Sequence, residues 1–124
     1  MRLLLDTHTL IWWADGKPLA VDADIAIRTP GNAVFVSAAT IWEAEIKAQT
    51  GKLNLDVDLA TESAEHGFAA LAITFAHAAA AGRLPAHHAD PFDRMLVAQA
   101  QLEGLTIVSR DPVFERYPVS LLKA

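Results

Sequence analysis

The stretch Arg2-Leu-Leu-Leu-Asp6 is a short apolar run that ends abruptly at a carboxylate. An uninterrupted apolar run of this length is typical of a strand that is buried on both faces of a sheet. Two further runs have the same character, Asn32-Ala-Val-Phe-Val-Ser37 and Leu105-Thr-Ile-Val-Ser109. Helical segments separate these runs, which predicts an α/β fold of three layers with a central, mostly parallel sheet flanked by helices.

Helix-start and helix-end signals divide the rest of the chain. Ser37 is positioned to cap the helix that follows the second run, and Gly51 ends that helix. Asp90-Pro91 places a capping Asp before a Pro at the first helical position, and Gly104 closes the helix that runs to Glu103. Further helices are expected over Leu10 to Ala14, Ala23 to Arg28, Asp58 to His66 and Ala76 to Gly82, and further strands over Leu71 to Phe75 and, at an edge, Val119 to Leu122.

Length and composition indicate one globular domain over residues 1–124, with 52% apolar and 20% charged residues. The chain has no cysteine, which excludes disulfides, thiolate zinc sites and a thiol nucleophile, and a reducing cytoplasm is the natural setting. The apolar run at Leu3 to Leu5 is too short for a signal peptide. The longest mostly apolar stretch, Ala69 to Gly82, contains His77 and is too short to span a membrane.

The formal net charge of −5 argues against a nucleic-acid partner, unless several carboxylates converge on a divalent cation. Parallel sheets place their sites beyond the carboxyl ends of the strands. Asp6 follows the first strand and Asp111 the strand that ends at Ser109, while Glu43 and Asp93 lie in helices next to these strands. The four acids are therefore candidates for one pocket. Oxygen ligands without His or Cys at metal spacing favour Mg²⁺ or Mn²⁺.

Taken singly, each acid also has a structural explanation. Asp6 can form a turn at the end of a strand, and Asp111 can open a turn before a proline. Glu43 can pair with Lys47 one helical turn further on, and Asp93 can complement the dipole of its helix. These explanations do not account for the delivery of several acids to the same sheet edge.

Histidine and tryptophan residues offer weaker signals. His87 and His88 lie in a loop bounded by prolines, where surface residues are the default expectation and support of the next helix or substrate contact are the alternatives. Trp12 and Trp13 point about 100° apart on a helix. One of the two is expected to enter the core and the other to lie at an interface.

Other functions fit the sequence less well. A receiver-type phosphoacceptor domain needs paired acids after its first strand and a Lys after its last, whereas here Asp6 is unpaired and Arg110 stands where the Lys is sought. A haloacid-dehalogenase-type phosphohydrolase needs a second Asp at the position of His8. A non-catalytic binding module with a vestigial pocket remains an alternative.

The chain resembles the PIN-domain ribonucleases and, among them, the VapC-like toxins of type II toxin–antitoxin pairs. The matching segments follow one another in the family's order over nearly the whole chain. They are Leu3 to Leu10, Val36-Ser37 with Trp42-Glu43 and Ile46-Lys47, Gly51 to Leu53, Leu84-Pro85 with His88 to Arg94, Ala98 to Ala100, and Val108 to Asp111.

This resemblance implies metal-dependent endonucleolytic cleavage of RNA, with Mg²⁺ (or Mn²⁺) as cofactor and with an antitoxin protein and a second toxin copy as partners. It implies that the catalytic and metal-binding residues are Asp6, Glu43, Asp93 and Asp111, and that Ser109 is a strand-end hydroxyl beside them, with Thr7 in a similar supporting place. Arg94 and Arg110 flank the predicted pocket and are the candidates for phosphate contacts. Asp90 is assigned as the helix cap, not as a ligand.

Overall fold

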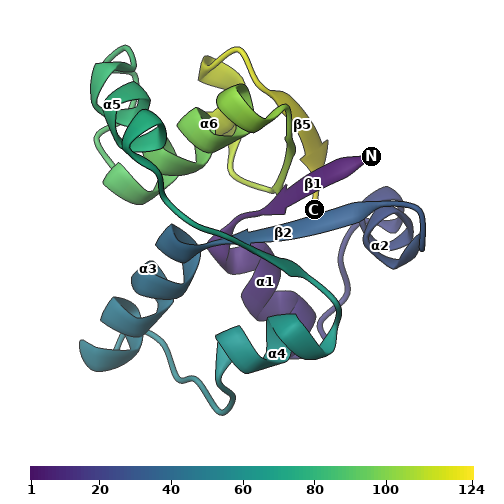
Figure 1. The fold of residues 1–124 in the computed structure, drawn as a ribbon. Coiled ribbons are helices and arrows are strands. Elements are labelled where there is room, and N and C mark those ends of the chain that lie inside the picture. The colour runs from purple at the N-terminus through teal and green to yellow at the C-terminus, as the bar shows by residue number, and fades with distance from the viewer.

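A single five-stranded parallel sheet organises the protein, whose computed structural model describes residues 1–124 (Figure 1). The strand order is β3-β2-β1-β4-β5, and every neighbouring pair is parallel. The strands are β1 (Arg2–Leu5), β2 (Ala33–Ser37), β3 (Ala69–Leu71), β4 (Thr106–Ser109) and β5 (Ser120–Lys123). The helices are α1 (Thr7–Ala14), α2 (Val21–Arg28), α3 (Ala38–Gln49), α4 (Leu59–Glu65), α5 (Phe75–Arg83) and α6 (Pro91–Glu103), with a 3₁₀ turn over Pro112–Arg116.

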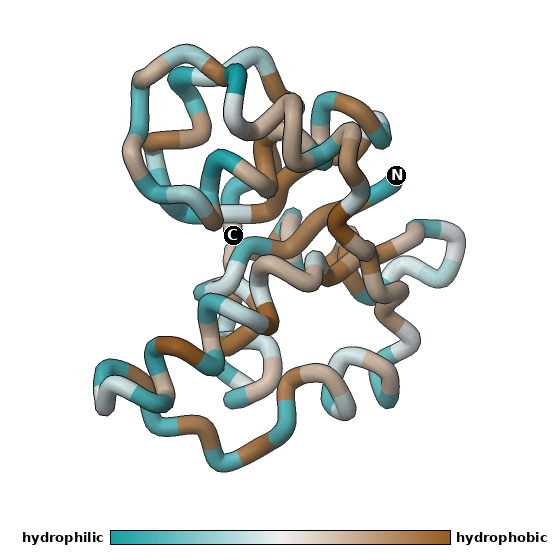
Figure 2. The backbone as a smooth tube through the Cα atoms, turned by 60° about the vertical axis from the view of Figure 1, so that its left-hand side comes forward, coloured by the Kyte–Doolittle hydropathy of each residue, from teal (hydrophilic) through white to brown (hydrophobic).

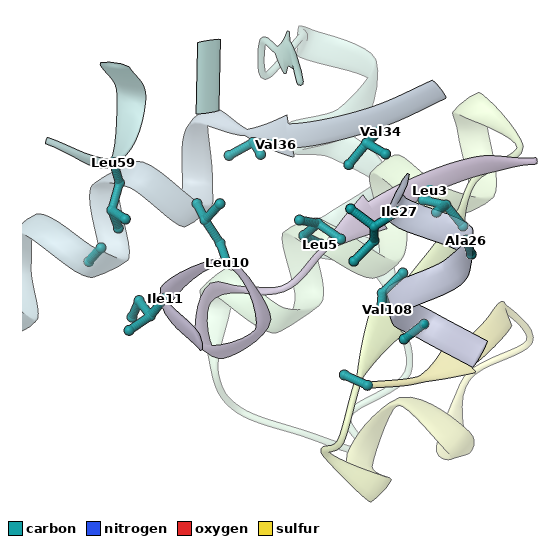
Figure 3. Close-up of a cluster of buried hydrophobic side chains, with 13 residues drawn as sticks. Leu3, Leu5, Leu10, Ile11, Ala26, Ile27, Val34, Val36, Leu59 and Val108 are labelled. Atoms are coloured by element: carbon teal, nitrogen blue, oxygen red, sulfur yellow. The ribbon is translucent and has the colours of Figure 1, made fainter. Parts of the chain in front are cut away.

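Helices cover both faces of the sheet, which confirms the predicted three-layer α/β fold. Side chains of β1 alternate between the two cores, since Leu3 and Leu5 pack with α1, α2 and α4 while Leu4 packs with α6. All three leucines are fully buried, which explains the uninterrupted apolar run. Figure 3 shows Leu5 between Val34 and Leu10 in the first of these cores.

The distribution of hydropathy along the chain follows this arrangement. In Figure 2 hydrophobic segments run through the middle of the molecule, and hydrophobic and hydrophilic residues alternate in the long connection between α3 and α4. Within that connection Leu53 and Leu55 pack against the core, so the alternation anchors a segment without regular structure. No helix is both long and apolar enough to cross a membrane.

Two elements differ from the sequence-based expectation. The helix expected from Leu10 begins at Thr7, because the Asp6 carboxylate accepts a hydrogen bond from the Thr9 N–H and caps it one residue after β1. The strand expected over Leu71 to Phe75 is wrong beyond Leu71. Thr74 and the ring of His77 cap α5 reciprocally, so Phe75 begins a helix and is 97% exposed.

The remaining local signals are confirmed. The Ser37 hydroxyl accepts a hydrogen bond from Ala39 N–H at the start of α3, and Gly104 ends α6 in the left-handed conformation at φ 65°. The expected edge strand forms as β5, parallel to β4. The chain order reverses between β1 and β4, and ligands of such sheets bind beyond the carboxyl ends of the strands at this reversal.

Candidate metal centre

A polar cleft of about 210 Å³ lies beyond the carboxyl ends of β1 and β4. None of its nine lining residues is hydrophobic. The structure brings together in it all four carboxylates selected from the sequence, each from a different element. The lining residues are Asp6, Thr7, His8, Glu43, Lys47, His88, Asp90, Asp93 and Asp111.

Asp6 joins the strand β1 to the helix α1 and is buried. One carboxylate oxygen accepts from the Thr9 N–H at 2.9 Å, and the other accepts from the Ser109 hydroxyl at 2.5 Å. The Ser109 hydroxyl oxygen in turn accepts a hydrogen bond from the Asp111 N–H at 3.0 Å. Ser109 therefore connects the carboxyl end of β1 with the carboxyl end of β4.

Glu43 reaches the cleft from the second turn of α3 and is also buried. The Thr7 hydroxyl donates a hydrogen bond to Glu43 Oε1, and Lys47 Nζ lies 3.2 Å from Glu43 Oε2. The i,i+4 ion pair expected from the sequence thus forms, but it forms inside the cleft and not on a solvated face. Lys47 places its ammonium group among the carboxylates, which spacing alone did not predict.

Asp93 lies in the first turn of α6 and is hydrogen bonded to His88 at 2.8 Å between Oδ2 and Nε2. The pKa of the Asp93 carboxyl is raised from 3.8 to about 6, chiefly because burial disfavours the charged form. The bond to His88 opposes this rise, while the negative charges of Asp90 and Glu43 add to it. The expectation that His88 is a surface residue is therefore wrong, although His87 is exposed.

Asp90 caps α6 as assigned, since its Oδ1 accepts from the N–H groups of Phe92 at 2.9 Å and Asp93 at 3.0 Å. Asp90 also lines the cleft, so the cap and the candidate ligands are adjacent. Asp111 likewise both lines the cleft and caps a turn. Its Oδ1 accepts a hydrogen bond from the Val113 N–H at 2.9 Å at the start of the 3₁₀ turn.

We expect Asp90→Ala to lower the free energy of unfolding by about 1 kcal/mol, because two N–H groups of α6 lose their acceptor. Asp90→Asn should restore most of this loss and change RNA cleavage little, since an amide oxygen caps almost as well as a carboxylate. Thermal melting and cleavage assays of both variants test this. Equal melting temperatures for Asp90→Ala and the wild type would contradict the capping role.

Neither arginine predicted to contact phosphate lines the cleft. The Arg94 guanidinium donates to four main-chain carbonyls, those of Ala81, Leu84, Pro85 and His88, at 2.9 to 3.3 Å. The N–H groups of its two terminal nitrogens are therefore committed to the end of α5 and the chain between α5 and α6.

Arg110 flanks the cleft on the side of Asp111. It donates to the carbonyls of Pro18 and Ala124, and its guanidinium lies 4.1 Å from the centre of the Trp12 ring. Trp13, the other residue of the tryptophan pair, packs against the core as one of the two was expected to do.

The donor set of the cleft fits a divalent cation. Five carboxylates line it, against one lysine. Several carboxylates held this close repel one another, and the charges of Asp90 and Glu43 add to the rise in the pKa of Asp93 that burial chiefly causes. A hard cation relieves the repulsion and suits carboxylate oxygens.

The parallel sheet, with an acidic cleft where its strand order reverses, places the protein among the α/β proteins whose ligand site lies beyond the carboxyl ends of the strands. The chain belongs to the PIN domain family, whose model matches residues 3–119. No curated protein matches the sequence.

Solved structures with this fold include complexes of toxin–antitoxin proteins. VapBC2 from Rickettsia felis, bound to a DNA fragment from its promoter, matches at a TM-score of 0.72 and 14% identity over 99% of this chain and 98% of that one. DNA-bound VapBC from Salmonella typhimurium matches at a TM-score of 0.70 and 21% identity over 99% of this chain and 98% of that one. A toxin–antitoxin complex from Klebsiella pneumoniae matches at a TM-score of 0.68 and 24% identity over 97% of this chain and 95% of that one.

The strand order also excludes one of the alternative functions considered from the sequence, the receiver-type phosphoacceptor domain. Receiver domains have the flavodoxin-like order 2-1-3-4-5, whereas this sheet has the order β3-β2-β1-β4-β5. The receiver interpretation is therefore wrong.

Proposed function

We propose that the protein is a metal-dependent endoribonuclease, a hydrolase of phosphodiester bonds that acts as the toxin of a toxin–antitoxin pair. The observation that carries this proposal is the convergence of Asp6, Glu43, Asp93 and Asp111 on one cleft of a PIN domain. The phosphate groups of RNA carry negative charge, and the carboxylates of the cleft repel them. RNA can therefore bind in this cleft only when a cation lies between the phosphates and the carboxylates.

Asp6, Glu43, Asp93 and Asp111 would hold Mg²⁺ or Mn²⁺ in this cleft. Such an ion, when bound, supplies an activated water and neutralises charge on the phosphate oxygens. The Thr7 and Ser109 hydroxyls fix the orientation of Glu43 and Asp6 by hydrogen bonds. Lys47 is the one lysine or arginine that lines the cleft and is placed to approach a phosphate there.

An antitoxin is the partner that we propose, on the strength of the similar structures, several of which are toxin–antitoxin complexes. An apolar groove of about 530 Å³ between α3 and α4 offers a surface for an apolar segment of that partner. Trp42, which is 61% exposed, lies in its lining next to Ile41 and is more open to a partner than the Trp12 and Trp13 pair. A toxin homodimer is the second assembly that we propose.

The proposal predicts RNA cleavage that depends strictly on a divalent cation. Purified protein is incubated with transfer, ribosomal and messenger RNAs, with Mg²⁺ or Mn²⁺ or after exhaustive chelation, and the cleaved ends are mapped. We expect cleavage to disappear on chelation and to return when the cation is restored.

Asp6→Asn protein, prepared in the same way, controls for contaminating ribonucleases. Undiminished cleavage after chelation would contradict the metal-dependent mechanism. Absence of cleavage of every RNA with both cations, in a protein that binds them, would favour the non-catalytic binding module.

A further inference from the structure

An imidazole stands among the carboxylates of the cleft, although the sequence suggests oxygen ligands alone. His88, Asp90 and Asp93 each contribute one potential ligand atom, and these three atoms lie within 4.8 Å of one another. Asp90 already uses Oδ1 to cap α6, so His88 and Asp93 are the members of this cluster with a donor atom directed at each other. The cleft therefore offers a nitrogen donor beside its oxygen donors.

The main chain around His88 is held in place from several sides, unlike that of an ordinary surface loop. Arg94 donates to the carbonyl of His88 itself at 3.3 Å and to the carbonyls of Leu84 and Pro85. Arg116 donates to the His87 carbonyl at 3.2 Å, and the Tyr117 hydroxyl donates to the Pro85 carbonyl at 3.3 Å. This anchoring fixes the main chain that carries His88, and the hydrogen bond to Asp93 orients its ring.

The separation of the two donor atoms suits neighbouring ligands on one ion. Nε2 of His88 lies 2.8 Å from Oδ2 of Asp93. Adjacent ligands of an octahedral ion with bonds of about 2.1 Å are about 3 Å apart. An ion bound by both atoms lies to one side of the line that joins them, so the imidazole ring turns from Asp93 toward the ion while the two donor atoms keep about their present separation.

We infer that His88 is a nitrogen ligand of the bound cation together with Asp93, and that it makes this cleft select Mn²⁺ over Mg²⁺. Mg²⁺ takes oxygen ligands almost exclusively, whereas Mn²⁺, although it too prefers carboxylate oxygens, belongs to the first-row transition metals and accepts an imidazole nitrogen more readily than Mg²⁺ does. The inference rests on the proposed metal site, but it concerns which ion the site holds and through which atom.

Pulsed electron paramagnetic resonance of Mn²⁺ bound to the metal-free protein tests the inference directly, because a coordinated imidazole gives a ¹⁴N coupling. We expect this coupling in the wild type and its loss in His88→Gln. Mn²⁺ should also bind at least about tenfold more weakly to His88→Gln, and Mg²⁺ affinity, measured by competition, should change far less. Labelling the wild type with ¹⁵N-histidine should replace the ¹⁴N pattern without any substitution, which identifies the ligand as a histidine in the unaltered protein, and the comparison with His88→Gln assigns it to His88.

Two other histidines provide matched controls. His87 is the exposed neighbour of His88, and His8 is another imidazole that lines the cleft. His87→Gln should keep both the ¹⁴N coupling and the Mn²⁺ affinity, and His8→Gln should keep the ¹⁴N coupling. A wild type without ¹⁴N coupling, or a coupling that survives in His88→Gln, would overturn the inference.

RNA cleavage by the same proteins separates this inference from the proposed function. Mn²⁺ with an imidazole ligand in a protein that cleaves no RNA would support the metal assignment and refute the nuclease. Cleavage by a protein whose Mn²⁺ has no nitrogen ligand would support the nuclease and refute the role of His88.

Discussion

Asp93→Asn should cleave RNA on the order of a thousandfold more slowly than the wild type, while its metal-free form melts at a higher temperature. The substitution removes a charged oxygen from the candidate metal ligands, and the amide cannot replace that charge. The same substitution removes a carboxylate that is unfavourable in the folded, metal-free protein, because burial and the charges of Asp90 and Glu43 act against its ionisation.

The stabilisation should depend on pH in a defined direction. The pKa of Asp93 is about 6 in the folded protein against 3.8 for the ordinary value, so between these values the unfolded chain has released a proton that the folded protein keeps. Wild-type stability therefore falls as pH rises through this window, and the penalty is complete above pH 6. The difference between these two pKa values corresponds to a loss of at most about 3 kcal/mol in the free energy of unfolding, and partial exposure of the side chain reduces this loss.

Melting temperatures of wild type and Asp93→Asn without metal, from pH 3.5 to 8, test this prediction. The variant should melt higher by about 5 °C above pH 6 and equally at pH 3.5. Asp58→Asn is the matched control, because Asp58 caps α4 and is exposed. Its cleavage activity and the pH dependence of its stability should match those of the wild type.

Expression in a bacterial host gives an independent readout of the same variant. The wild type alone should arrest growth, and Asp93→Asn should not. An active Asp93→Asn beside an inactive Asp90→Asn would show that the other carboxylate of this helix start is the ligand.

The general position of the site follows from the sequence, because the rules that place it are independent of side-chain detail. Carboxyl ends of parallel strands meet at one edge, so Asp6 and Asp111 were expected at the same edge once both runs were assigned as strands, and the pairing of β1 with β4 makes them neighbours. The caps at Ser37 and Asp90 are equally predictable, since the hydrogen bonds involved span two or three residues.

The surroundings of the carboxylates depend instead on contacts between distant segments. Composition identifies the chain around His88 as a loop, but its direction is set by Arg94 and Tyr117, which are known only once α6 and the 3₁₀ turn are in place. The start of α5 is different, because the pairing of Thr74 with His77 is local. That pairing was the available signal against a strand reaching Phe75.

Arg94→Lys should lower the free energy of unfolding by about 2 kcal/mol and reduce RNA cleavage, although the positive charge is kept. The guanidinium donates to four carbonyls between Ala81 and His88, and an ammonium group on a different stem cannot reproduce this geometry. The loop that presents His88 and Asp90 to the cleft then loses its anchor. Thermal melting and cleavage at saturating Mn²⁺ measure the two effects.

A phosphate-binding Arg94 makes the opposite prediction, so the same variant discriminates between the two roles. Lysine binds phosphate as a point charge, so in that case stability should stay unchanged and only cleavage should fall. Arg83→Lys is the control, because Arg83 is an exposed residue in the last turn of α5 and forms none of these carbonyl contacts. An Arg94→Lys protein that melts with the wild type and with Arg83→Lys would contradict the anchoring role, because four hydrogen bonds to the main chain cannot be lost without effect on stability.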